Sequence, residues 1–370
     1  MSTIDTLEPI LYNEACEQIE PDEAETSERL LKTLLQISDT TFKDTGRALR
    51  SVHAKSHGLL KGMLTVADLD EPLAQGMFAQ AGQAMPVLIR LSTTPGDLLD
   101  DRISTPRGFA MKVIGVSGKR LPGSETAVTQ DFLLINGPTF LAPNAKKFLN
   151  SLKLLAATTD KVPRLKRAFS TMLQSTEKAL EAMGGESGAV KGLGGHPETH
   201  ILGETFYSAV PFLYGRNMAK WQIVPVSATL LALTDQPVDL KDKPDGLREA
   251  VVEYFRSNSA EWELRAQLCT NLDTMPIEDA SVRWPEEQSP FVTIARITVP
   301  QQLAWSDDHS SQMDDGLAFS PWHGLAAHRP LGSINRVRKN AYAGSAHARS
   351  PRGRCPVHEP QPAVSVELDG

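Results

Sequence analysis

The stretch WELRAQLC, residues 262–269, alternates apolar and polar side chains in the manner of a half-buried β-strand. Seven other short apolar runs, bounded by Gly, Pro, Asp or Asn, lie on either side of a helical block. The eight expected strands are 59–66, 85–93, 108–116, 130–136, 204–210, 219–229, 262–270 and 291–299. Because few helices separate neighbouring strands, the pattern predicts an α+β domain with antiparallel pairing, and eight strands are enough to close a β-barrel.

Helical periodicity of apolar residues places helices around these strands. The expected helices are 28–45, 144–157, 163–183, 245–257 and 334–349, with a Gly-rich loop at 184–195. The chain is then expected to divide into an N-terminal arm and helix over 1–49, a barrel domain over 50–350 and an irregular C-terminal tail over 351–370.

The composition is that of an ordinary globular protein, with 370 residues of which 41% are hydrophobic and 22% are charged. With 38 basic and 45 acidic side chains, the net charge of −7 offers no overall positive surface to nucleic acid or an anionic membrane. The three cysteines, Cys16, Cys269 and Cys355, form no C-x-x-C pair, which argues against a disulfide scaffold or structural zinc site and favours a cytoplasmic location. No signal-peptide pattern and no apolar stretch of about 18 residues is present, so no membrane span is expected.

Two segments at opposite ends of the expected barrel domain carry residues suited to catalysis. Residues 50–57, RSVHAKSH, place Arg50 and His53 directly before an expected strand, where a loop can project them into a pocket. Taken alone, this segment favours a structural histidine and a solvated cation.

The second segment is one face of the helix 334–349, where Arg338, Tyr342, Ser345 and Arg349 follow at intervals of four, three and four residues. A guanidinium one turn away favours the phenolate form of a tyrosine, and phenolate is a hard oxygen ligand suited to Fe(III). Periodicity alone favours the simpler interpretation, a basic helix surface with one half-buried tyrosine.

Six motifs, in order along residues 50–350, together resemble the haem catalase superfamily. They are Arg50-x-Val52-His53-Ala-Lys, Ile89-Arg90-Leu-Ser92-Thr, Pro106-Arg107-Gly108-Phe109-Ala110, Asp131-Phe-Leu-Leu-Ile-Asn136-Gly-Pro138-Thr-Phe140 with Phe148, Phe319-x-Pro321, and Arg338-x-x-x-Tyr342 followed by Arg349. The resemblance implies an antiparallel eight-stranded β-barrel of catalase type with surrounding helices, which agrees with the strand count.

The resemblance also implies a b-type haem and a role for each matched residue. Tyr342 is implied as the phenolate ligand of the iron, supported by Arg338, and His53 as the acid–base group on the distal side of the haem. The other matched positions are Arg50, Arg90 and Arg349 at the haem propionates, Ser92 hydrogen-bonded to the distal histidine, Phe140 and Phe148 lining the distal side, and Val52 beside the histidine. This set implies a hydroperoxidase that reduces hydrogen peroxide or organic hydroperoxides through a ferryl intermediate, with an electron donor that the sequence does not reveal.

Two departures from the family pattern bear on the reaction. The chain stops soon after the proximal helix, whereas typical haem catalases are longer. Counting back from Phe140 puts Ile135 where the distal asparagine belongs, and Asn136 one place later. We expect a one-residue shift that restores the catalytic role to Asn136; an apolar Ile135 in its place removes a peroxide-orienting hydrogen bond and weakens catalase activity.

Two other functions remain open on the sequence alone. Short relatives include allene oxide synthases and hydroperoxide lyases, which rearrange fatty acid hydroperoxides; the allene oxide synthase branch usually has Thr before the distal histidine, whereas this chain has Val52. A haem-binding sensor or carrier needs a ligand such as Tyr342 but no acid–base group such as His53. Relatives usually form oligomers, so the resemblance also points to a homo-oligomer.

Overall fold

The computed structural model describes residues 8–158 and 198–360. The predicted helix 163–183 and the predicted Gly-rich loop 184–195 lie outside these ranges.

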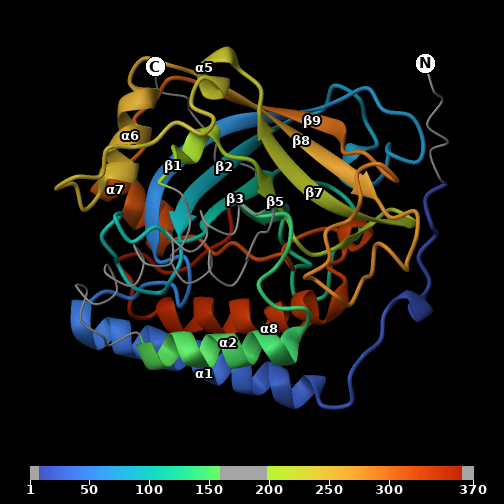
Figure 1. The fold of residues 1–370 in the computed structure, drawn as a ribbon, viewed down its shortest axis with the longest axis horizontal. Helices are drawn as coiled ribbons and strands as arrows, with labels where there is room; N and C mark the ends of the chain where they lie inside the picture. Colours follow the sequence, from blue (N-terminus) through green and yellow to red (C-terminus); the bar gives the residue numbers. More distant parts are fainter. Residues whose placement is uncertain (1–7, 159–197, 361–370) are drawn as a thin grey trace, which may run out of the picture.

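Eight strands of the described chain form a closed antiparallel barrel, which confirms the predicted fold (Figure 1). They are β1 (Lys55–Val66), β2 (Ala84–Thr93), β3 (Arg107–Ile114), β4 (Thr129–Ile135), β5 (Phe206–Tyr207), β7 (Asn217–Pro225), β8 (Ala260–Leu268) and β9 (Val292–Val299). β1 pairs with both β2 and β9, and β5 pairs with both β4 and β7, so that the last of these contacts closes the ring. A short further strand, β6 (Phe212–Tyr214), pairs with β7 outside the ring.

Two predicted strands are shorter than expected. The run at 204–210 contributes only the two-residue β5. The run at 219–229 leaves the sheet at Pro225 and continues into the short helix α5 (Ala228–Leu231). Proline has no N–H to donate to a strand ladder, so the apolar run beyond it does not propagate the sheet. β6 escaped prediction because three residues are too few to show a period-2 pattern.

The alternation in β8 sends every second side chain into the barrel. Trp262, Leu264 and Ala266 are fully buried in the barrel core, while the polar residues between them stay partly exposed. Burying a large apolar side chain stabilises a fold by about 1.5–3 kcal/mol. The approach of β1 to β9 is tight at Gly62, where a Cβ atom would lie 2.5 Å from the carbonyl oxygen of Thr298 in β9.

Three helices lie side by side along one side of the barrel and are called the helical layer below: α1 (Glu23–Thr45), α2 (Ala145–Thr158) and α8 (Gly332–Arg349) (Figure 1). One apolar cluster joins them, made of Leu30, Leu34, Ile37, Ala145, Leu149, Leu152, Val337 and Ala341. α5 and α6 (Gly246–Phe255) lie on the far side of the barrel from this layer (Figure 1).

α1 begins five residues before the predicted start at 28. Two acidic side chains in its first turn, Glu23 and Glu25, interact favourably with the positive end of the helix dipole. The helix ends at Gly46, whose φ of 67° is the left-handed conformation that glycine adopts most easily, and whose N–H caps the carbonyl of Phe42.

Glu359, in the described part of the C-terminal tail, is bound to the barrel wall by a buried charge cluster. Lys112 Nζ lies 2.8 Å from Asp131 Oδ1 and 2.8 Å from Glu359 Oε2, and both Lys112 and Asp131 are fully buried. His323 Nδ1 lies 3.2 Å from Asp131 Oδ2 and 3.1 Å from Glu359 Oε1. Although burial opposes it, hydrogen bonding to the two carboxylates raises the pKa of His323 to about 9.

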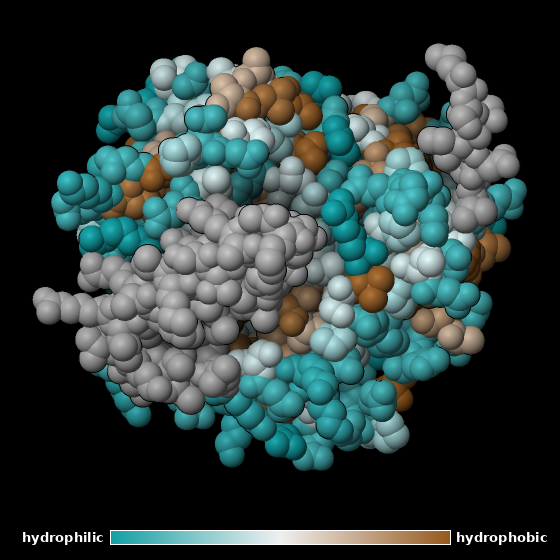
Figure 2. Space-filling view, viewed as in Figure 1, coloured by the Kyte–Doolittle hydropathy of each residue, from teal (hydrophilic) through white to brown (hydrophobic). Residues whose placement is uncertain are grey.

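The surface is mainly hydrophilic on the face shown in Figure 2, where hydrophobic residues form small separate groups. Exposed large apolar side chains include Leu98 and Leu231. Within residues 8–158 and 198–360, no helix combines the length and apolarity needed to cross a membrane.

Candidate active site

The outer face of β1–β4 forms the wall on which the predicted site residues gather. Register places Ser92, Gly108 and Ile135 side by side, because Ser92 pairs with Gly108 and Gly108 pairs with Ile135. Their sequence neighbours Phe109 and Leu134 point into the barrel core. Since successive strand residues face opposite sides, the three residues in the row face outward.

His53 lies against this wall in a constrained conformation. Its φ of 53° falls in the left-handed region, which is strained for a residue that has a side chain. A hydrogen bond of 3.2 Å joins His53 Nδ1 to Ser92 Oγ, and Gly108 leaves space for the ring, because a Cβ there would lie 2.7 Å from Nδ1. Burial and the charges of Arg90 and Arg338 lower the pKa of His53 to about 3, so the imidazole is neutral at physiological pH.

The loop that carries His53 is held by the helical layer. Ser51 Oγ lies 2.7 Å from Ser38 Oγ of α1 and 3.3 Å from Ser345 Oγ of α8, both within hydrogen-bond distance. These two contacts join the entrance of β1 to both helices. The position of the histidine therefore depends on the helices as well as on the barrel wall.

The three arginines predicted to meet propionates converge on one aspartate, Asp314. Arg90 Nε donates to Asp314 Oδ1 at 2.6 Å. Nη1 of Arg50 and Nη1 of Arg349 donate to the backbone oxygen of Asp314 at 2.6 and 3.0 Å. Burial opposes ionisation of Asp314, but Arg90 and Arg50 outweigh it and lower its pKa to about 2. We call these four residues the arginine cluster.

Tyr342 packs against the apolar cluster of the helical layer, together with Val52 and Phe148. Phe148 packs edge-to-face on Phe140 with 4.9 Å between ring centroids, and the guanidinium of Arg338 lies 5.2 Å from the centroid of Phe140. In the described part of the chain, no hydrogen bond joins Arg338 to Tyr342. These contacts connect five predicted site residues, of which Phe140 and Phe148 also pack against the apolar core of the barrel.

The side-chain amide of Asn136 is bonded on both of its polar atoms. Its Oδ1 accepts a hydrogen bond of 2.8 Å from the backbone N–H of Arg107, and its Nδ2 donates to Glu204. Asn136 follows Ile135 at the end of β4, and alternation gives Ile135 the outward position beside Gly108. The catalytic role expected for Asn136 stays a prediction, and these contacts make Ile135 the alternative beside Gly108.

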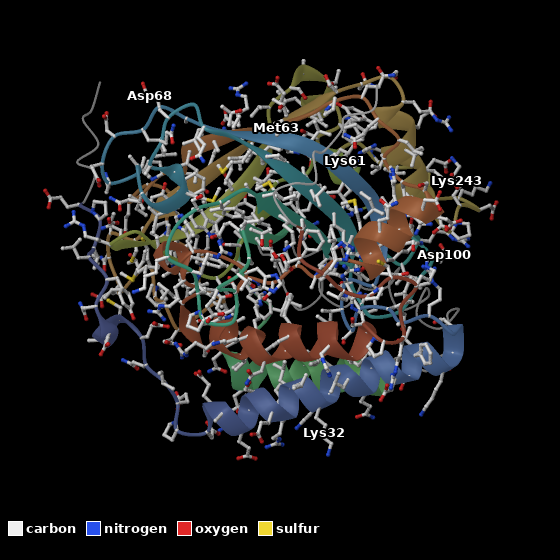
Figure 3. All side chains as sticks on the ribbon, turned by 180° about the vertical axis from the view of Figure 1, so that it is seen from behind. Lys32, Lys61, Met63, Asp68, Asp100 and Lys243 are labelled. Atoms are coloured by element: carbon white, nitrogen blue, oxygen red, sulfur yellow. The ribbon has the colours of Figure 1, made fainter. Side chains whose placement is uncertain are left out.

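A cavity of about 530 Å³ opens beside the arginine cluster, and Arg50 and Asp314 form part of its wall. Asp100, labelled in Figure 3, also lines it. Trp305 Nε1 donates to Ser56 Oγ at 3.0 Å, and Ser56 Oγ donates to Asp314 Oδ2 at 2.6 Å. A hydrogen-bond chain therefore runs from the cavity wall to the arginine cluster.

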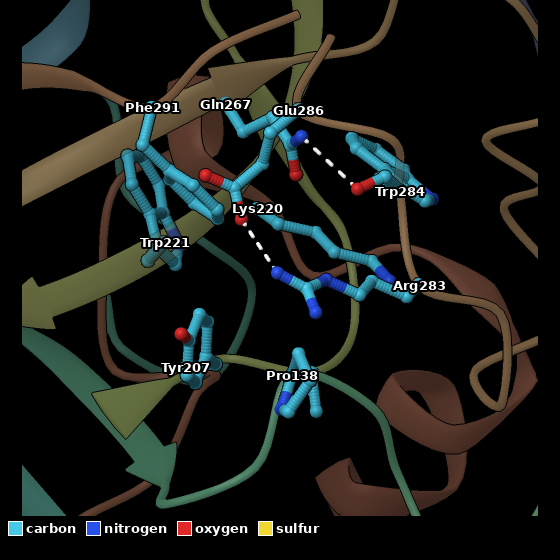
Figure 4. A pocket seen from close by; sticks show the side chains of 10 residues that line it. Pro138, Tyr207, Lys220, Trp221, Gln267, Arg283, Trp284, Glu286 and Phe291 are labelled. Carbon is cyan, nitrogen blue, oxygen red and sulfur yellow. Dashed lines mark hydrogen bonds and ion pairs between the residues drawn. The ribbon is translucent and has the colours of Figure 1, made fainter. Parts of the chain in front are cut away.

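A second, much smaller pocket of about 10 Å³ lies beside β7 and β8 (Figure 4). Burial lowers the pKa of Lys220 in its wall to about 7, and Lys220 Nζ donates to the carbonyl of Val282 at 3.1 Å. A pocket of this size holds about one water molecule. None of its lining residues is a predicted site residue, so it is separate from the candidate site.

The family model described as Catalase matches residues 24–325, which is most of the chain. This chain belongs to the catalase family. Among curated proteins, a catalase of Ascaris suum is 25% identical over 297 residues, covering 74% of this chain and 51% of that protein. The chain therefore spans about half the length of this catalase.

Solved catalase structures share the fold. Catalase A from Saccharomyces cerevisiae superposes with a TM-score of 0.60 at 19% identity, covering 84% of this chain and 63% of that chain. A fungal catalase gives a TM-score of 0.58 at 19% identity, covering 85% and 61%. A bacterial catalase gives 0.58 at 15% identity, covering 87% and 62%.

The arginine cluster fits the haem that membership of the catalase family implies. Three guanidiniums against one carboxylate leave two positive charges, because the neighbouring Asp315 is already paired with Arg354 at 2.6 Å. Nε of Arg349 is buried without a hydrogen-bond partner among the described residues. A b-type haem carries two propionates. Their two negative charges would balance the two positive charges of the cluster, and their oxygens would accept a hydrogen bond from Nε of Arg349.

Sequence reasoning missed Asp314, although it is central to the site. It lies in the segment SSQMDDG, residues 310–316, which matches none of the six motifs. Its partners Arg90 and Arg50 are 224 and 264 residues away in the chain. Only tertiary contacts reveal it, and no local pattern could have found it.

Proposed function

We propose that this chain is a haem-dependent hydroperoxidase that reduces hydrogen peroxide or organic hydroperoxides and has weak catalase activity. The observation that carries the proposal is His53, a neutral imidazole oriented by Ser92 over Gly108 on the barrel wall. The arginine cluster lies on the same wall, since Arg90 and Ser92 belong to one strand and both face outward. A carrier of haem has no need of such a group.

His53 acts as the proton shuttle in this proposal. A hydroperoxide must lose a proton from one oxygen and gain one on the leaving oxygen, and a neutral imidazole can do both in turn. The bond from Nδ1 to Ser92 fixes the ring, so Nε2 is the atom that accepts the proton and then returns it. Haem, when bound, supplies the redox chemistry that breaks the O–O bond.

The remaining predicted residues would hold the haem. Tyr342 would bind the iron as phenolate, and Arg338 would favour that charged form. The guanidiniums of Arg50, Arg90 and Arg349 would bind the propionates, as charge-assisted hydrogen bonds to carboxylates are strong.

Ile135 is the reason to propose weak catalase activity. It occupies the outward position beside Gly108, while the amide of Asn136 is bonded to Arg107 and Glu204. Among the described residues, the position beside Gly108 on this wall thus carries an apolar side chain rather than a hydrogen-bond donor that would orient hydrogen peroxide, and orientation contributes strongly to rate. The apolar side chain of Ile135 is compatible with the alkyl group of an organic hydroperoxide.

The proposal is tested by comparing His53→Ala with wild type after loading with haem. The exposed His347 of α8 provides a matched control, His347→Ala. We expect wild type and the control to consume cumene hydroperoxide with an added reductant and to release little oxygen from hydrogen peroxide alone. His53→Ala should retain haem but lose its reactivity toward peroxide. Unchanged turnover in His53→Ala would contradict the mechanism, and rapid oxygen release by wild type would contradict weak catalase activity.

The same preparation separates the alternative reaction. Incubation with a fatty acid hydroperoxide and no reductant should leave the substrate largely unchanged. Formation of an allene oxide or an aldehyde without reductant would instead establish hydroperoxide rearrangement.

A further inference from the structure

Asp314 is the most heavily bonded acidic group of the described chain near the candidate site. It lies in the π-helical segment η5 (Ser310–Asp315), and its side chain accepts hydrogen bonds from Arg90 and Ser56, both at 2.6 Å. Arg50 Nη1 lies 3.3 Å from the same carboxylate. Two of the donors to Asp314, Arg90 and Arg50, are therefore groups suited to bind an external carboxylate.

The three arginines need an opposite charge close by. Arg50, Arg90 and Arg349 come from three separate segments. Burial and the charges of Arg90 and Arg349 lower the pKa of Arg50, and burial and the charge of Arg90 lower the pKa of Arg349. Buried like charges destabilise a fold unless an opposite charge compensates them. Asp314 provides that compensation from within the chain.

The same arrangement makes Asp314 a competitor of any carboxylate ligand. A haem propionate would seek the N–H groups of Arg90 and Arg50 that Asp314 now occupies. The cavity of about 530 Å³, lined by Arg50, Ser56 and Asp314, gives the aspartate room to move away from the arginines. At Arg90 and Arg50, binding therefore exchanges one carboxylate for another, whereas Nε of Arg349 remains a donor that a propionate can fill directly.

We propose that Asp314 is an internal counter-ion that occupies the arginine cluster in the haem-free chain and yields it to a haem propionate on binding. This inference rests on the proposed function, because it assumes that the cluster receives haem. It makes Asp314 a positioning residue that sets haem affinity and keeps the haem-free chain folded.

The test compares haem with haem dimethyl ester, in which both propionates are neutral, as ligands of wild type and Asp314→Asn. The readout is the dissociation constant of each ligand from absorbance titration. We expect Asp314→Asn to increase the preference for haem over the ester about tenfold, since that corresponds to about 1.4 kcal/mol, a modest part of the repulsion between two nearby carboxylates. The haem-free variant should also unfold at lower denaturant concentration than wild type.

Two further variants make the outcome decisive. Asp315→Asn alters the neighbouring carboxylate, which pairs with Arg354, and should leave the preference unchanged. Ser56→Ala removes one donor to Asp314 but keeps every charge, so it should shift the preference in the same direction by less, and it decides the question if Asp314→Asn does not fold.

An unchanged preference in folded Asp314→Asn, or equal weakening of both ligands, would overturn the inference and leave Asp314 a purely structural residue. If wild type binds neither ligand, the proposed function fails and this inference fails with it. If wild type binds haem and the preference stays fixed, only the inference about Asp314 fails.

Discussion

Adding a single methyl group at Gly108 should slow the reaction with peroxide without removing haem. A Cβ at this position would lie 2.7 Å from Nδ1 of His53, whereas ordinary contact begins at about 3.4 Å. Gly108 is paired with strands on both sides, through Ser92 and Ile135, so the backbone is held and the imidazole is the part that moves. The ring is therefore displaced by about 0.7 Å in Gly108→Ala.

The size of the kinetic effect follows from that displacement. A misplacement of about 1 Å costs on the order of 100-fold in rate, so a shift of about 0.7 Å should cost about 20-fold, or about 1.8 kcal/mol of activation free energy. Stability should change little, because the group that yields is the end of a side chain. The substitution thus separates positioning of His53 from folding of the barrel.

Stopped-flow absorbance of the haem-loaded protein after mixing with peroxide measures this rate directly. Gly137→Ala is the matched control, because the nearest atom to a Cβ there is the backbone oxygen of Thr139 at 3.8 Å. We expect the control to react at the wild-type rate and both variants to bind haem fully. A wild-type rate in Gly108→Ala would refute the claim that His53 must lie where the structure puts it.

Two other predictions concern stability. Gly62→Ala should lower the free energy of unfolding by about 2–3 kcal/mol, measured by chemical denaturation, because its Cβ would lie 2.5 Å from the backbone of β9, the strand paired with β1. The folded pKa of His323, about 9, lies above its usual value of 6.5, so its stabilising effect is present below pH 6.5 and is lost as pH rises through 9. The free energy of unfolding of wild type should therefore fall by up to about 3 kcal/mol between pH 6.5 and 9.5, and that of His323→Gln should fall less. The same dependence of unfolding free energy on pH in both proteins would show that His323 does not stabilise the tail.

The barrel could be predicted from sequence because most of its strands are short apolar or alternating runs that can be recognised locally. The period-2 alternation at 262–268 matches β8 almost residue for residue, since one face is buried in a core that contains Trp262 and Leu264. The prediction lost accuracy where strands are very short. β5 and β6 depend on pairing with β7, and pairing between distant segments leaves little trace in two or three residues.

The candidate site was predicted unevenly for a similar reason. Motif order identified Arg50, Arg90 and Arg349, and the structure brings their side chains together. The same approach leaves Asn136 and Ile135 as alternatives, because a motif gives a position in the chain but not the face of the strand on which a side chain lies. Asp314 had no motif at all, and its role is set by charges that arrive from other segments.

The three residues 51–53 show how the fold supplies the constraint that the chemistry needs. Ser51 is bonded to α1 and α8, Val52 packs against the apolar cluster of the helical layer, and His53 is left in a left-handed conformation over the wall. Such a conformation costs on the order of 1–3 kcal/mol, so the contacts of its neighbours and the bond to Ser92 must hold it. The helical layer is therefore more than a cover for the barrel. Because the same contacts fix α1, α8 and the loop, loosening the layer should release His53 before it unfolds the barrel, and reactivity toward peroxide should be lost at milder conditions than the fold.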